Sequence, residues 1–166
     1  MKKYILAILV FLGLQFFAQA QSSEREKGRG VYVELFGNGI TYSFNYDQRF
    51  SNRFDGLGFK AGVSYFAIDG SSLTTLPLGL NYLLGKEGKY FEVGMGGTYL
   101  RGADKNNNFT VGDSRTVGDG FVGTMVFGYR REPVDGGFLF RASLTPVFTS
   151  EFFWPLSIGI SFGYAF

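Results

Sequence analysis

The 166-residue sequence contains no cysteine and no histidine, and only 4 prolines and 1 tryptophan. Without cysteine the chain cannot form disulfides, thiolate zinc sites or a cysteine nucleophile. Without histidine it lacks the most common metal ligand and the most common general base. Charged residues make up only 18% of the chain, a balance too apolar for disorder or for a basic nucleic-acid binder. These absences argue against most enzyme chemistry, and we expect no metal and no other cofactor.

Aromatic residues and glycines are abundant instead. The chain is 45% hydrophobic and 19% aromatic, and it contains 25 glycines. Its length predicts one domain, because a compact unit typically needs about 100–200 residues. A soluble core of this size does not normally combine many large rings with many glycines. This combination is the first sign of an unusual surface.

The first 20 residues have the organisation of a secretory signal peptide. Lys2 and Lys3 precede an uncharged apolar run at 4–17, and the small residues before the predicted cleavage after Ala20 suit a signal peptidase. Removal of 1–20 leaves 14 basic and 14 acidic side chains. The exported chain is therefore neutral, and its bulk charge gives no reason to expect nucleic-acid binding.

The rest of the chain alternates between bulky and small residues, and no part of it shows a sustained helical period. The clearest example is the C-terminal stretch, where small residues separate every pair of bulky ones. A β-strand projects successive side chains to opposite faces, so this pattern builds a two-faced ribbon. Its bulky positions are Trp154, Leu156, Ile158, Ile160, Phe162, Tyr164 and Phe166.

The same alternation recurs upstream and predicts eight strands in total. Breaks rich in Gly, Asn, Asp, Ser or Pro separate them, so neighbouring strands should pair in antiparallel fashion. If the mature chain starts in the periplasm, the longest break, at 102–119, faces the cell exterior. The predicted strands are 31–36, 40–50, 57–65, 76–84, 91–99, 121–130, 138–148 and 154–166.

The small faces of these strands must point into a closed barrel. The interior of an eight-stranded barrel is just wide enough for side chains to fill it, so the bulky faces cannot all point inward. Outside, they form the apolar band that a transmembrane barrel requires. The predicted fold is an all-β, eight-stranded antiparallel up-and-down transmembrane β-barrel over 30–166, after a periplasmic N-terminal segment at 21–29. Aromatic residues near strand ends suit interfacial girdles: Phe50, Tyr65, Tyr90, Tyr99, Tyr129, Phe138 and Trp154.

Several charged residues fall on the small, inward faces. Isolated buried charges are too costly to keep, so these groups should pair across the lumen. Two hypotheses stay open: a polar network that fills the barrel and blocks conduction, or a narrow pore gated by exchange of ion-pair partners. The predicted lumenal charge network consists of Glu34, Asp47, Glu92, Arg49, Lys60, Arg130 and Arg141.

The predicted exterior loop also carries a weak calcium-like pattern. Asp104, Asn106 and Asn108 stand at alternate positions, as the first ligands of a calcium loop do. Phe109 occupies the place of the required glycine, and no glutamate completes the set. We therefore expect a solvated loop rather than a metal site.

Four segments carry a resemblance to a known group of proteins. They are LPLGLNYLLGK at 76–86, YFEVG at 90–94, GGFLFR at 136–141 and ISFGYAF at 160–166. With them the chain resembles the small OmpA/OmpX-like outer-membrane β-barrel proteins of Gram-negative bacteria, most closely those common in Bacteroidota. The resemblance implies a location in the outer membrane in contact with its lipid, and it assigns no activity. It also implies that the barrel-assembly machinery reads the terminal aromatic residues Phe162, Tyr164 and Phe166.

Three functional hypotheses follow. We expect a non-enzymatic envelope barrel whose exterior loops, chiefly 102–119, serve adhesion, binding of an extracellular or envelope protein, or membrane integrity. The alternative is a small-solute pore through the charged lumen. A lipid-modifying or proteolytic enzyme ranks last, because it would have to use a serine with a lysine or glutamate in place of histidine.

Overall fold

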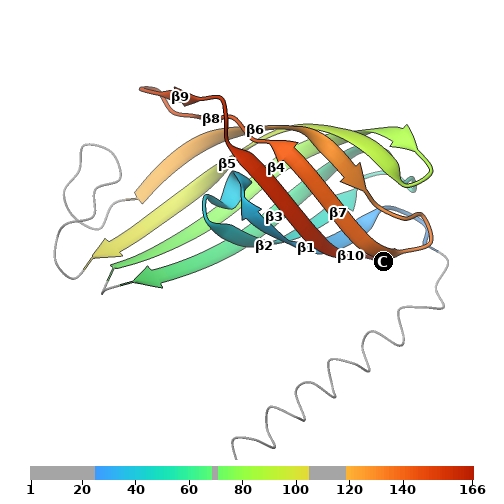
Figure 1. Ribbon diagram of the computed structural model, residues 1–166, viewed down its shortest axis with the longest axis horizontal. Coiled ribbons are helices and arrows are strands. Elements are labelled where there is room, and N and C mark those ends of the chain that lie inside the picture. Colours follow the sequence, from blue (N-terminus) through green and yellow to red (C-terminus); the bar gives the residue numbers. More distant parts are fainter. Residues whose placement is uncertain (1–24, 69–70, 105–118) are drawn as a thin grey trace, which may run out of the picture.

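The computed structural model describes residues 25–68, 71–104 and 119–166, so the predicted signal peptide lies outside the described residues. Eight antiparallel strands form the wall of a barrel (Figure 1). No helix in these three ranges is long and apolar enough to cross a membrane. The wall consists of β1 (Arg29–Phe36), β2 (Tyr42–Arg49), β3 (Gly56–Ile68), β4 (Ser71–Lys86), β5 (Lys89–Asp104), β6 (Asp119–Arg131), β7 (Gly137–Leu144) and β10 (Ile158–Ala165).

The barrel is closed by hydrogen bonds between its first and last strands. Gly30 at the start of β1 lies opposite Ala165 at the end of β10, and every other strand of the wall pairs with its sequence neighbours in the wall. A closed sheet has no free edge along its paired length, so its backbone N–H and C=O groups are satisfied internally. The structure confirms the predicted fold class.

The side chains are arranged as predicted, with bulky apolar residues outside and charged ones inside. Leu78 and Met95 are 60% and 63% exposed on the outer surface, whereas the Arg130 and Arg141 side chains are fully buried. Several large rings and aliphatic side chains also lie inside. Tyr90 is buried, so the prediction that it belongs to an aromatic girdle was wrong. The even-numbered residues of β5 face the lumen, and the outward-facing ring at this point is that of the next residue, Phe91. The other buried ones are Tyr32, Leu83, Leu100, Val122, Val126 and Leu139.

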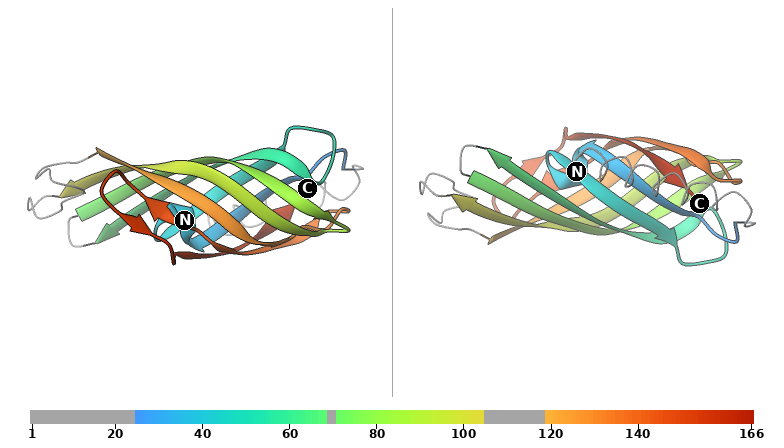
Figure 2. Two further views of the ribbon diagram at one scale, coloured as in Figure 1. Left: turned by 90° about the horizontal axis from the view of Figure 1, so that it is seen from above. Right: turned by 90° about the horizontal axis from the view of Figure 1, so that it is seen from below.

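The wall has two unequal halves. The neighbouring strands β7, β10, β1 and β2 each contain 8 residues, whereas β3, β4, β5 and β6 contain 13 to 16. The long strands project beyond the short ones at one end of the barrel (Figure 2). The other end holds the start of β1 and the end of β10.

The last outward connection differs from the sequence prediction. The predicted strands 138–148 and 154–166 are each interrupted. The end of the first and the start of the second form a separate small hairpin of β8 (Val147–Phe148) and β9 (Phe153–Trp154). The interruptions fall at Pro146 and Pro155, which have no N–H to contribute to a ladder. The alternation of bulky residues continues through both prolines, so the pattern alone predicted strands that were too long.

The turn between β1 and β2 bends into the lumen. It contains the short 3₁₀ helix η1 (Gly37–Gly39), whose three residues are all buried. Phe36 and Ile40 on either side adopt positive φ angles of 60° and 73°, a strained conformation for residues with a Cβ. Their side chains stay exposed on the apolar surface. The strain therefore lets the turn enter the barrel while both apolar flanks remain outside.

A charge on the outer face should destabilise the barrel. Ile160 faces outward near the middle of β10. We expect Ile160→Arg to cost about 2–4 kcal/mol of unfolding free energy near the bilayer midplane, and Ile160→Leu to change it little. Urea unfolding of the refolded protein in lipid vesicles measures both. Equal stability of the two variants would contradict the lipid-facing assignment.

Candidate functional site

The lumen is filled by polar side chains, and it contains all seven residues of the charge network expected from the sequence. Each is at most 3% exposed, and together they come from six strands of the wall. They are Glu34 on β1, Asp47 and Arg49 on β2, Lys60 on β3, Glu92 on β5, Arg130 on β6 and Arg141 on β7. Inward parity positions them, because each strand presents alternate residues to the same narrow interior.

Arg141 joins the two glutamates of the network. Its Nε donates to Glu92 Oε2 at 2.6 Å and its Nη2 donates to Glu92 Oε1 at 3.1 Å, a bidentate pair. Its Nη1 also donates to Glu34 Oε1 at 2.6 Å. A planar guanidinium suits this role because it presents its donors in a fixed fork.

Asp47 is the centre of a second group. Its Oδ1 accepts from Arg49 Nη2 at 2.5 Å and from Arg130 Nη2 at 3.0 Å. Asn81 on β4 links this group to the first, because its Nδ2 donates to Asp47 Oδ2 at 2.7 Å and to Glu92 Oε1 at 2.9 Å. Asn81 lies on the predicted inward face, but as a neutral residue it was not among the charges predicted to form the network. A neutral amide therefore hydrogen-bonds to both ionic groups, which also meet where Arg130 Nη1 lies 3.9 Å from Glu92 Oε2.

Two charged residues that the sequence did not predict as lumenal extend the network to the end of the barrel near the start of β1. Glu132 follows β6 and accepts from Arg130 Nε at 2.9 Å. Arg25, which precedes β1, donates from Nη2 to Glu132 Oε1 at 2.7 Å. Glu132 lies two residues after Arg130 and therefore faces the same side of the chain. Extending the alternation past the predicted strand end at 130 would have predicted it as a lumenal charge. Arg25 carries no such signal, since its position depends on how the chain enters the barrel.

At its opposite end the network reaches η1. Glu34 Oε2 accepts from the backbone N–H of Asn38 at 3.3 Å, and the Asn38 carbonyl accepts from Thr98 Oγ1 at 2.6 Å. Hydrogen bonds therefore connect Arg25 to Asn38 through a continuous polar column, which we call the lumenal column. It consists of Arg25, Glu132, Arg130, Asp47, Arg49, Asn81, Glu92, Arg141, Glu34 and Asn38.

Lys60 is the exception among the seven. Its Nζ is buried and has no hydrogen-bond partner among the described residues. It lies within electrostatic range of Arg141 and of three acids of the column, Glu34, Glu92 and Asp47. These acids already bind arginines at short range, so Lys60 adds positive charge to the lumen without joining the column.

The described residues offer little for metal chemistry. No group of three or more acidic, histidine or cysteine side chains able to hold a metal occurs within 25–68, 71–104 and 119–166. The calcium-like pattern falls outside the described residues, apart from the backbone of Asp104.

The residues expected to form the C-terminal assembly signal lie on the outer surface at the end of the barrel wall. Phe162 packs on Phe140 of β7 with ring centroids 5.6 Å apart. Phe166 follows β10 and donates its backbone N–H to the Arg29 carbonyl at 3.1 Å. Tyr164 lies opposite Val31 on the outer face of the β10–β1 ladder.

The fold and the polar lumen together define the class of small outer-membrane-type β-barrels. No protein-family model and no curated protein sequence matches the chain. Solved structures do. The N-terminal β-barrel domain of Pseudomonas aeruginosa OprF is similar with a TM-score of 0.59 and 13% identity, over 86% of this chain and 98% of that one. The Yersinia pestis outer membrane protein Ail, solved in a phospholipid bilayer nanodisc, is similar with a TM-score of 0.52 and 14% identity, over 86% of this chain and 100% of that one.

Removing one carboxylate from the lumenal column should destabilise the barrel strongly. Glu92→Gln leaves the buried Arg141 guanidinium without its bidentate partner, so we expect a loss of about 3–5 kcal/mol of unfolding free energy. The matched control is Ser143→Ala, since the buried Ser143 Oγ has no hydrogen-bond partner among the described residues. Urea unfolding followed by the fluorescence of the single tryptophan, Trp154, measures both. Unfolding of Glu92→Gln at the wild-type urea concentration would contradict the assigned pairing.

Proposed function

We propose that this protein is a non-enzymatic integral outer-membrane barrel with a closed lumen, whose role is structural or depends on interactions at its exterior end. The observation that carries the proposal is the lumenal column. Its side chains are buried and bonded to one another across the interior, and η1 covers the end of the column opposite Arg25. Buried charges that are paired in this way stabilise a filled interior and leave no open path for solutes.

The outer surface supports a location in the membrane. Bulky apolar residues cover it, and an apolar surface of that extent in water would be a severe aggregation hazard. Outer-membrane barrels have short periplasmic turns and longer exterior loops. By this rule the end with the start of β1 and the short turns at 87–88 and 132–136 is periplasmic. The projecting ends of β3 to β6 then point out of the cell.

The N-terminal and C-terminal sequences fit this location. Residues 1–20 would direct export as a cleaved signal peptide, and Phe162, Tyr164 and Phe166 would serve as the signal for the barrel-assembly machinery. The segments quoted above for the resemblance support placing the protein among the small barrels common in Bacteroidota.

An enzymatic role has little support in the described structure. A serine activated by lysine needs the two side chains within hydrogen-bond reach. Lys60 is the only lysine buried among the described residues, and its Nζ has no hydrogen-bond partner there. The buried serines bond to other groups or to none: Ser43 to Asn45, Ser64 to Thr75 and Ser161 to Arg141.

Planar-bilayer recording separates a closed barrel from a pore. We expect no single-channel steps from the refolded wild type, because the lumenal column fills the interior. The triple variant Glu34→Ala, Glu92→Ala, Arg141→Ala removes one complete group of the column and should produce steps. The matched control, Arg53→Ala with Asp55→Ala, removes an exposed ion pair of 2.8 Å at the β2–β3 turn and should stay silent. Steady steps from the wild type would instead establish the gated pore.

Cross-linking on intact cells tests the exterior interaction. We expect a companion protein to be cross-linked to the wild type and lost when residues 105–118, which lie outside the described residues, are replaced by a short Gly-Ser turn. Glu87→Ala in the β4–β5 turn at the opposite end serves as the control and should keep the companion. Equal recovery from all three proteins would show that this segment makes no contact with a partner.

A further inference from the structure

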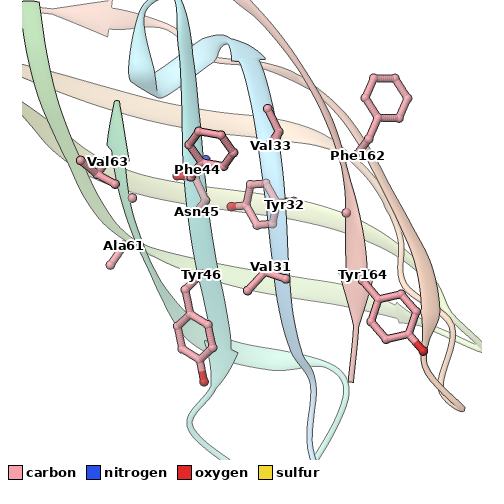
Figure 3. Close-up of a pocket in the computed structure, with 12 residues that line it drawn as sticks. Val31, Tyr32, Val33, Phe44, Asn45, Tyr46, Ala61, Val63, Phe162 and Tyr164 are labelled. Atoms are coloured by element: carbon pink, nitrogen blue, oxygen red, sulfur yellow. The ribbon is translucent and has the colours of Figure 1, made fainter. Parts of the chain in front are cut away.

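The lipid-facing wall of the barrel contains a groove of about 680 Å³ across β10, β1, β2 and β3 (Figure 3). Its floor is formed by Val31 and Val33 on β1. Aromatic side chains stand on both sides, Phe162 and Tyr164 on β10 and Phe44 and Tyr46 on β2. Ala61 and Val63 continue the lining on β3.

Strand register explains why the groove is continuous. On the outer face, Val31 lies between Tyr164 and Tyr46, and Val33 lies between Phe162 and Phe44. Two successive rows therefore place a small aliphatic residue between two rings. Because neighbouring strands are about 4.8 Å apart, the aromatic ridges on β10 and β2 stand about 10 Å from each other.

Three of the four rings that flank β1, those of Phe162, Tyr164 and Tyr46, lean away from it. Phe162 packs toward β7, with its ring centroid 5.6 Å from that of Phe140, and in Figure 3 the Phe162 and Tyr164 rings point away from β1. Tyr46 packs toward β3, with its ring centroid 6.0 Å from that of Phe59. Phe162 and Tyr46 thus pack against strands on the outer sides of the groove, whereas Phe44 packs on Tyr42 of its own strand, with ring centroids 6.1 Å apart.

A positively charged residue, Arg29, lies at the periplasmic end of the outward-facing row of β1 that forms the groove floor. Arg29 precedes Val31 by two positions on β1, so it shares the outward parity of the groove floor. Its guanidinium forms no ion pair within the described residues, whereas Arg25 and the lumenal arginines are paired. A cation at a membrane interface attracts the phosphate of a lipid headgroup.

We propose that this groove binds one glycerophospholipid of the periplasmic leaflet, with an acyl chain along Val31 and Val33 and the phosphate at Arg29. The inference rests on the proposed membrane location. An acyl chain fits the shape of the site, because it is a thin apolar rod and the groove is an apolar furrow between two ridges. A second barrel fits it poorly, since two convex walls covered with bulky side chains meet along their ridges. The phosphate and Arg29 supply the charge complementarity that fixes the direction of the lipid.

Native mass spectrometry of protein extracted from phosphatidylglycerol vesicles tests the proposal. We expect the wild type to retain one phosphatidylglycerol and Val33→Trp, which fills the floor, to lose it by about tenfold or more. Val31→Trp is read in the same way if Val33→Trp does not refold. Arg29→Gln should reduce retained phosphatidylglycerol about fivefold and leave unchanged the retention of diacylglycerol with the same acyl chains.

The matched control is Val93→Trp on the far wall. Val93 also lies between two rings, Tyr82 and Phe127. The outward residues before and after it on β5, however, are the larger Phe91 and Met95, so no groove runs along this strand. This variant should retain lipid as the wild type does. Equal retention by wild type and Val33→Trp, or equal loss from Val33→Trp and Val93→Trp, would overturn the groove assignment. Equal effects of Arg29→Gln on both lipids would overturn the role of the phosphate.

Flotation of the wild type with vesicles separates this proposal from the one on which it rests. A protein that floats and resists protease but retains no phosphatidylglycerol refutes only the groove. A protein that does not float refutes the membrane location and the lipid site together.

Discussion

The narrow lumen of an eight-stranded barrel is the constraint on which this structure depends. Such an interior has room for side chains and little else, so whatever points inward must pack and pair with the opposite wall. Here the inward positions carry charged residues from six strands, and no bulk water surrounds them. Each buried charge is costly alone and acceptable when paired. Closing the barrel and completing the lumenal column are therefore one event, since the paired residues come from opposite sides of the wall.

The same constraint explains the strained turn at η1. The half of the wall formed by 8-residue strands stops short of the projecting ends of the long strands. Without η1 the lumenal column would be uncovered at that level. Bending Gly37–Gly39 inward places the Asn38 backbone between Glu34 and Thr98. Two positions in this turn require glycine, because a Cβ on Gly37 would lie 2.9 Å from the Glu34 carboxyl carbon and a Cβ on Gly39 would lie 2.6 Å from Ser43 Cβ. The polar interior and the local backbone conformation are thus coupled.

The outer surface follows a different rule, because its side chains do not have to pack against an opposite wall. Most of it is a dense band of large side chains, but over β1 the small outward residues are flanked by rings that mostly lean away. The groove over β1 arises in this way. The barrel thus combines an interior in which nearly every charge has a partner with an apolar exterior whose regions differ mainly in shape.

The sequence by itself determined the number of strands in the wall and which face of each points out of the barrel, because a period of two records sidedness directly. It also identified seven lumenal charges by parity. Only the tertiary structure decided which of them pair, that Asn81, Glu132 and Arg25 join the column, and that Lys60 stays apart. It also decided that η1 turns inward and that Tyr90 lies inside. Alternation assigns a residue to a face, whereas partners across a barrel depend on register and on the entry of the chain, which no local pattern records.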